Sequence, residues 1–110
     1  MLEPGRVAMI AFPFSDLSSA KRRPVLLLTA PDTVGDFICM AVTSKAYHPQ
    51  SIAIGDGDFV IGRLPVASFV RADKVYTLCA AQIDHEVGTL QRETFRRAIA
   101  ALCEVVDGRH

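Results

Sequence analysis

The sequence predicts a mainly β protein, a small twisted barrel or sheet with one amphipathic helix packed against it. Two observations lead to this prediction. Most apolar residues stand in short segments rich in Val, Ile, Phe and Leu, and Gly, Pro, Asp or Ser bound these segments. Only the last part of the chain repeats its apolar residues at helical spacing. The 110 residues suffice for one core, so we expect a single domain over residues 1–110.

Three strands are expected in the first half of the chain. Residues 7–12 form an apolar segment that begins after Pro4-Gly5 and stops at Pro13. Residues 25–29 form a dense apolar run directly after a proline, which is typical of a strand that is buried on both faces. Residues 37–43 form the third segment of this kind.

The second half of the chain contains a turn signal and a longer strand. Gly55-Asp56-Gly57 lies between the apolar segments 51–54 and 58–61, so we expect a hairpin there. Residues 69–78 can supply an inner face with one irregularity, which a β-bulge near Asp73 would explain. One more short strand is expected within residues 82–90.

The terminal segment has the pattern of an amphipathic helix. Its apolar residues recur three and four positions apart, and charged residues occupy the other side. These apolar positions are Phe95, Ala98, Ile99, Leu102, Val105 and Val106. Asp107-Gly108 is expected to end the helix.

The charge balance argues against binding to a polyanion by net charge alone. Lys and Arg number 12, Asp and Glu number 12, and the formal net charge is zero, so any nucleic-acid site must come from local clustering. No group of His, Cys, Asp and Glu has the spacing of metal ligands, so neither a metal site nor a cofactor is expected.

Targeting signals are not apparent. The first residues have no basic region followed by an apolar stretch, and no apolar run approaches the roughly 20 residues of a membrane span. The three cysteines are widely spaced and lie in apolar runs, which predicts buried free thiols. We therefore expect a protein of the cytoplasm.

Five segments, taken in order, resemble the PemK/MazF family of toxin endoribonucleases. Gly5-Arg6-Val7 stands where the family usually has Gly-Asp-Val before its first strand. The other segments are Phe12-Pro13-Phe14-Ser15-Asp16-Leu17 with Lys21-Arg22-Arg23-Pro24-Val25-Leu26, then Ala41-Val42-Thr43-Ser44-Lys45, then Val70 to Leu78, then Gly88-Thr89-Leu90 with the terminal helix. The similarity covers nearly the whole chain.

The resemblance implies a fold and an activity. The family's fold is a small SH3-like barrel of the CcdB/MazF type with a C-terminal helix. Its members are homodimers that cut single-stranded RNA at short sequences without a metal, inhibit growth and are inhibited by a cognate antitoxin protein. The family's catalytic Arg and Thr map to Arg23 and Thr43 of this sequence. A guanidinium suits phosphate binding and the stabilisation of transition-state charge, and it is a poor general base.

Other residues around these two are candidates for RNA binding. Lys21, Arg22 and Lys45 could bind flanking phosphates, and each one taken alone could equally be a solubilising surface charge. Tyr47 could stack on an unpaired base. His48 is a candidate acid or base, although an exposed loop histidine before Pro49 is the favoured interpretation. The remaining candidates, from the loop before Lys21 and the end of the third strand, are Asp16, Ser18, Ser19 and Ser44.

One departure from the family keeps two alternatives open. Many relatives carry a stretch like Gly-Ser-Glu-Gln where this chain has Asp16-Leu17-Ser18-Ser19-Ala20, so a Glu that could take up the proton is missing. The chain could therefore be a catalytically inactive barrel that only binds its partners. The other alternative is a gyrase-binding toxin like CcdB, although such a protein has no use for Arg23 and Thr43.

Overall fold

The computed structural model describes residues 2–12, 21–45 and 49–108 and contains seven strands and one α-helix in that part of the chain. The strands are β1 (Arg6–Phe12), β2 (Lys21–Leu27), β3 (Asp36–Thr43), β4 (Ser51–Ile54), β5 (Phe59–Gly62), β6 (Ser68–Cys79) and β7 (Ile83–Leu90). Single 3₁₀ turns precede β5 (Asp56–Asp58) and β7 (Ala80–Gln82), and α1 (Arg92–Asp107) ends the fold. The predicted mainly β class with a C-terminal helix is confirmed.

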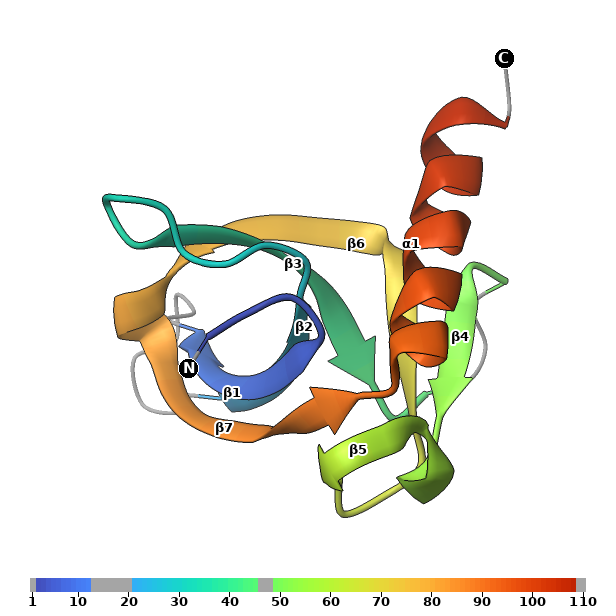
Figure 1. Cartoon of the computed structure of the whole chain (residues 1–110), viewed down its shortest axis with the longest axis horizontal. Helices are drawn as coiled ribbons and strands as arrows, with labels where there is room; N and C mark the ends of the chain where they lie inside the picture. Colours follow the sequence, from blue (N-terminus) through green and yellow to red (C-terminus); the bar gives the residue numbers. More distant parts are fainter. Residues whose placement is uncertain (1, 13–20, 46–48, 109–110) are drawn as a thin grey trace.

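All seven strands form one antiparallel sheet in the order β4-β6-β3-β2-β1-β7-β5. The sheet curls into a half-barrel, and α1 lies beside β4 and β6 (Figure 1). Apolar clusters fill both faces of the curled sheet. One packs Leu26, Met40 and Val70 toward the helix, and the other gathers Ile10, Val25 and Phe37 on the opposite side. The helix spans the expected residues, but Gly108 ends it at a φ of −77° and so does not use the left-handed region.

The predicted hairpin across Gly55-Asp56-Gly57 is wrong. β4 pairs with β6 and β5 pairs with β7, so these two neighbours in sequence lie at opposite edges of the sheet. The triplet does reverse the chain locally, through a 3₁₀ turn in which the Asp58 carboxylate accepts a hydrogen bond from the backbone N–H of Gly55 (2.8 Å). The residues therefore form a turn as predicted, but β4 and β5 pair with β6 and β7, which come later in the chain, and not with each other.

The predicted bulge near Asp73 is confirmed. On β3, Met40 and Ala41 are neighbours, but their partners on β6 are Val75 and Arg71, so residues 72–74 are extra on the β6 side. A bulge of this kind re-aims side chains locally. It lies next to the site described below.

The edge strand β5 is fixed by two glycines. Gly62 pairs with Gly88 of β7 and has a positive φ of +76°. A Cβ at Gly62 would collide with the backbone carbonyl oxygen of Val87, and a Cβ at Gly88 would collide with that of Ile61. This close approach anchors the segment 63–67, which follows β5 and reaches the site.

Two further observations concern the expectations from composition. Cys39 is buried as predicted and Cys79 is half-buried, but Cys103 is exposed because the outer face of α1 presents it to solvent. Within the described residues, no helix is long and apolar enough to cross a membrane.

Candidate nucleic-acid interface and active site

A cavity of about 950 Å³ opens where β2 and β3 separate. The paired positions of these strands end at Val25 and Ala41, although β2 begins four residues earlier and β3 ends two residues later. Pro24 stands at this junction, and because proline has no N–H it cannot donate to a continued ladder. The cavity residues fall into three groups: Met9, Arg22, Arg23, Pro24 and Val25 from β1 and β2; Ala41, Val42, Thr43, Ser44 and Lys45 around the end of β3; and Leu64, Pro65, Val66, Ser68, Arg71, Lys74 and Tyr76 from the segment leading into β6 and from β6 itself.

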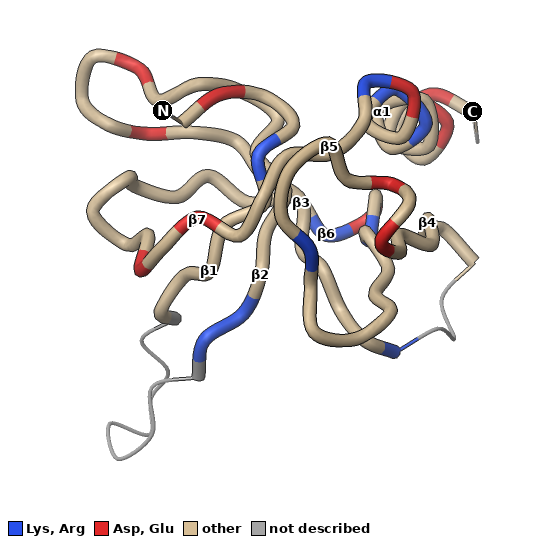
Figure 2. The backbone as a smooth tube through the Cα atoms, turned by 60° about the horizontal axis from the view of Figure 1, so that its bottom comes forward, with Lys and Arg blue, Asp and Glu red and all other residues tan. Residues whose placement is uncertain are grey.

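The described cavity lining is basic although the chain is neutral overall, and two of its cations, Arg22 and Arg71, are ion-paired with Asp84 and Asp73. Five of its described lining residues are cationic and none of them is acidic. They are Arg22, Arg23, Lys45, Arg71 and Lys74, and Figure 2 marks the basic positions along β2 and β6. Local clustering of this kind attracts a polyanion even when the net charge is zero.

Arg23 and Thr43 lie just outside the paired part of β2 and β3. Arg23 stands two residues before Val25, and Thr43 stands two residues after its partner Ala41. Both line the cavity, and the Arg23 side chain is exposed. The Thr43 hydroxyl oxygen accepts a hydrogen bond from the backbone N–H of Lys45 (3.2 Å). Because this bond uses the hydroxyl as an acceptor, its hydrogen remains available for donation into the cavity.

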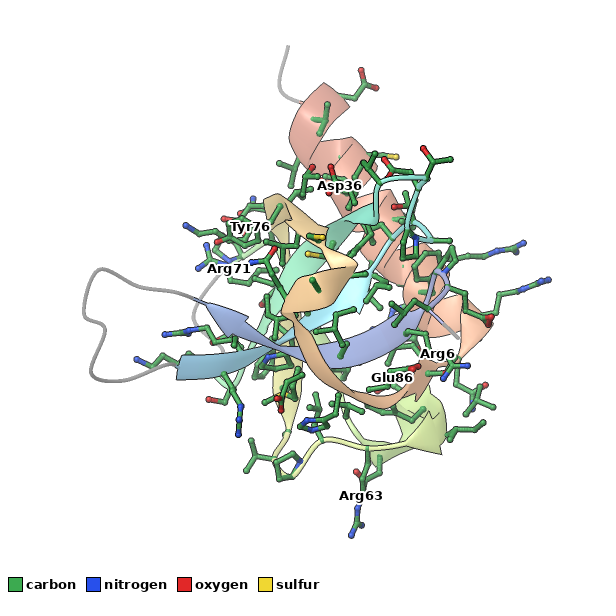
Figure 3. All side chains as sticks on the ribbon, turned by 90° about the vertical axis from the view of Figure 1, so that its left-hand side faces the viewer. Arg6, Asp36, Arg63, Arg71, Tyr76 and Glu86 are labelled. Carbon is green, nitrogen blue, oxygen red and sulfur yellow. The ribbon has the colours of Figure 1, made fainter. Side chains whose placement is uncertain are left out.

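β6 contributes a second arginine that is held in place. Arg71 Nε and Nη2 donate to the two carboxylate oxygens of Asp73 at 3.0 and 2.6 Å, a bidentate pair that is about one-fifth exposed. Figure 3 shows Arg71 and Tyr76 on the same side of the molecule. The two residues pair with β3 on either side of the β6 bulge, Arg71 with Ala41 and Tyr76 with Cys39, and both line the cavity.

The structure brings together five of the residues predicted from the sequence. Arg22, Arg23, Thr43, Ser44 and Lys45 all line the one cavity. Lys21 begins β2, but its side chain lies outside what the structure describes. Asp16, Ser18, Ser19, Tyr47 and His48 fall outside the described residues.

Sequence reasoning missed the part of the wall that comes from later in the chain. Lys74 and Tyr76 reach the cavity through the pairing of β6 with β3, and Leu64, Pro65 and Val66 add an apolar side. A half-exposed tyrosine next to an apolar wall is the kind of surface on which an unpaired base stacks. The described residues contain no group of three His, Cys, Asp or Glu side chains arranged to hold a metal ion.

The fold and the sequence have recognisable relatives. At a TM-score of 0.75 and 18% identity, the structure matches an endoribonuclease in complex with its cognate antitoxin from a mycobacterial species, covering 100% of this chain and 98% of that one. A MazE-MazF structure from Deinococcus radiodurans matches at a TM-score of 0.77 and 18% identity, with 94% of each chain covered. A second mycobacterial endoribonuclease matches at 0.69 and 21% identity, with 94% of this chain and 89% of that one covered. At these identities the likeness shows a shared fold.

The sequence itself provides the assignment to a family. A search of curated proteins finds no match. The family model for the PemK-like, MazF-like toxin of type II toxin-antitoxin systems matches residues 3–106, nearly the whole chain. The protein therefore belongs to the PemK/MazF family of type II toxin-antitoxin toxins, which are RNA-cleaving enzymes.

Proposed function

We propose that this chain is a sequence-specific, metal-independent endoribonuclease toxin that cuts single-stranded RNA and thereby stops translation and growth. The observation that carries the proposal is the joint position of Arg23 and Thr43 in one cavity lined by five cations and no described acid. The substrate is single-stranded because only unpaired bases can turn toward the apolar wall and Tyr76.

The proposed reaction is attack by the 2′-hydroxyl on the adjacent phosphorus. The 2′-oxygen forms a bond to phosphorus while the bond to the 5′-oxygen breaks, which leaves a 2′,3′-cyclic phosphate and a 5′-hydroxyl. One proton leaves the nucleophile and one reaches the leaving oxygen. The protein must align the backbone and neutralise the charge that develops on the phosphorane oxygens.

Arg23 is the residue proposed to stabilise that charge. Its guanidinium stays protonated at ordinary pH and offers several N–H donors in one plane, which match two phosphate oxygens. Thr43 supplies a further donor, because Lys45 N–H orients its hydroxyl while leaving the hydrogen free. Together the two residues act as an electrostatic clamp, and substrate alignment provides much of the rate.

The surrounding cations are proposed to hold the flanking backbone. Arg22, Lys45 and Lys74 line the same cavity, and Ser44 adds a hydroxyl next to Thr43. Lys21 extends this basic stretch in sequence. Phosphate contacts of this kind fix the register of the strand, whereas polar groups that contact base edges set the sequence preference.

The partners follow from the same charge and from the relatives. We propose a homodimer whose antitoxin carries an acidic, disordered segment that folds across the basic cavity. Structures of related proteins contain an antitoxin, as a mycobacterial complex and as MazE-MazF. The proposal places one toxin domain over residues 1–110 in the prokaryotic cytoplasm, where the RNA substrate is found.

The test is cleavage of a long unstructured RNA in excess chelator. Wild-type protein is expected to give fragments with a 5′-hydroxyl, and Arg23→Ala to reduce the rate at least about a hundredfold. Arg92→Ala, which removes an exposed arginine from α1, serves as the charge control and should leave the rate unchanged.

Other outcomes would change the proposal in defined ways. Cleavage that survives Arg23→Ala keeps the function and rejects the mechanism, and full activity of Arg23→Lys rejects the bidentate part of it. A folded, antitoxin-free wild type that cuts no RNA would favour a binding-only barrel or a gyrase-binding toxin instead.

A further inference from the structure

A second cavity, of about 600 Å³, adjoins the first. The two cavities share one wall, because Leu64, Pro65 and Val66 line both of them. The rest of the second lining comes from the end of β4, the 3₁₀ turn after it, and β5 with the segment that follows. A strand of RNA that leaves the first cavity over residues 64–66 therefore enters the second.

The second cavity differs from the first in charge. Its described lining contains one acid, Asp56, and one cation, Arg63, so the formal charges cancel. Its apolar lining includes the buried side chains of Ile54, Phe59 and Leu64. A cavity without net positive charge has little attraction for phosphate, whereas an apolar lining with a few polar groups suits a flat ring. The second cavity therefore fits a nucleobase better than a phosphate.

Asp56 and Arg63 are available to a ligand. Arg63 Nη1 lies 3.9 Å from Asp56 Oδ2, and the two side chains are about three-quarters exposed. An ion pair this long and this exposed contributes little to stability, so a ligand can replace it at small cost. Within the described parts of the chain, neither side chain makes another hydrogen bond or ion pair.

The turn that carries Asp56 is held in place by its neighbour Asp58. The Asp58 carboxylate accepts hydrogen bonds from the hydroxyl of the buried Thr94 (2.9 Å) and from the backbone N–H of Gly55 (2.8 Å). Its backbone carbonyl accepts a third from the N–H of Gln91 (2.7 Å). These contacts tie the turn to the start of α1, so the wall that presents Asp56 is formed before a ligand binds.

A carboxylate beside a guanidinium matches the Watson–Crick edge of guanine. Guanine has two adjacent N–H donors on this edge, at N1 and N2, and the acceptor O6 stands next to them. The two donors can reach both oxygens of Asp56, which only accepts, while Arg63 donates to O6. Adenine, cytosine and uracil each offer a carboxylate one donor position on this edge. In single-stranded RNA the edge is unpaired and open to such contacts.

We propose that the second cavity is a guanine-reading subsite, in which Asp56 and Arg63 hydrogen-bond to the base of a nucleotide that flanks the scissile bond. The inference rests on the proposed ribonuclease function and deepens it by naming the base that is read and the residues that read it. The ring packs on the apolar lining, and the Watson–Crick edge faces the two charged side chains. Asp56 is thus a specificity-determining residue with no part in the proton transfers.

The first experiment maps cleavage sites. A long unstructured RNA of mixed sequence is cut by wild type, Asp56→Asn and Asp107→Asn, and the 5′-hydroxyl ends are sequenced. Wild type is expected to enrich guanine at one fixed position beside the cut. Asp56→Asn should lose this enrichment, because an amide presents N–H donors of its own to a base that also donates. Asp107→Asn removes the same charge from the exposed end of α1 and should keep it.

The second experiment removes one hydrogen-bond donor from the base. Inosine, which lacks the N2 amino group, replaces the guanine at the enriched position. The kcat/KM of wild type should fall about tenfold, and that of Asp56→Asn should change less than about twofold. With a 2′-O-methyl group at the cleaved nucleotide, Asp56→Asn should bind the guanine RNA more weakly but not the same RNA with adenine there. A distorted cavity wall would weaken both.

The outcomes separate this inference from the function on which it rests. A wild type that cuts RNA without guanine enrichment beside the cut overturns the subsite and keeps the ribonuclease. Enrichment that survives Asp56→Asn, or an equal inosine effect in both proteins, also overturns it and leaves the second cavity to a protein partner. A wild type that neither binds nor cuts RNA refutes the proposed function and the subsite together.

Discussion

The two halves of β2 perform different tasks within one strand. The first half, residues 21–24, pairs with β1 but has no paired positions on β3, and its arginines are exposed. In the second half, residues 25–27 all pair with β3, Val25 and Leu26 also pair with β1, and all three are completely buried. Pro24 marks the change from one to the other. The comparison shows that the β2–β3 side of the cavity opens because the ladder between these two strands ends early.

This division predicts that stability and activity can be changed independently along the strand. Substitutions in residues 25–27 should act on the free energy of unfolding, and those in residues 21–24 on RNA cleavage. The largest effect on stability is expected at Leu26.

Leu26→Ala should lower the free energy of unfolding by about 3 kcal/mol, because a fully buried leucine leaves a cavity behind. Urea denaturation measures the loss, and Arg23→Ala is the paired control on the same strand, with an expected change below about 0.5 kcal/mol. An equal loss in both variants would refute the division of the strand.

Cys39 belongs to the buried region of this comparison, because it pairs with Leu27 in the second half of β2. Burial raises the pKa of the Cys39 thiol from 9.0 to about 12. Because the folded protein holds this proton more tightly, the stabilisation is complete below pH 9. It is lost as the pH rises from 9 toward 12, by at most about 1.4 kcal/mol per pH unit.

Urea denaturation between pH 7 and pH 11 tests this expectation. The difference in slope between wild type and Cys39→Ala isolates the thiol from the lysines and tyrosines that also titrate. Parallel slopes for the two proteins would show that Cys39 is not protected in the folded state.

The smallest effect is expected at Lys74, an exposed cation on the far wall of the cavity. Lys74→Ala should weaken RNA binding about twofold to fivefold and reduce the salt dependence of the affinity by roughly one phosphate contact, with kcat unchanged. Affinities measured across a salt series test it. An unchanged salt slope would remove Lys74 from the RNA path.

Most of the strands could be predicted from local sequence, because alternation and turn residues are local signals. Residues 7–12 and 37–43 match β1 and β3 to within one residue at either end. β2 begins four residues before the predicted segment, since the apolar pattern starts only where the strand becomes buried. The hairpin prediction failed for a different reason: no local signal states whether β4 will pair with β5 or with β6.

The candidate site, like the fold, could be predicted only in part. Arg23 and Thr43 could be identified through the resemblance to a family, and the structure places both in one cavity. Tyr76 could not, because its position depends on a bulge and on pairing between distant strands.

The order of the strands has a consequence for the moment at which the protein becomes active during synthesis. β2 and β3 emerge early, but the far wall with Arg71, Lys74 and Tyr76 belongs to β6, which is synthesised later and pairs with the distant strand β3. Contacts of high sequence separation form late in folding. A ribosome-bound fragment that ends before β6 therefore has the arginine and the threonine but lacks the far wall, so the cavity is complete only after β6 has been synthesised.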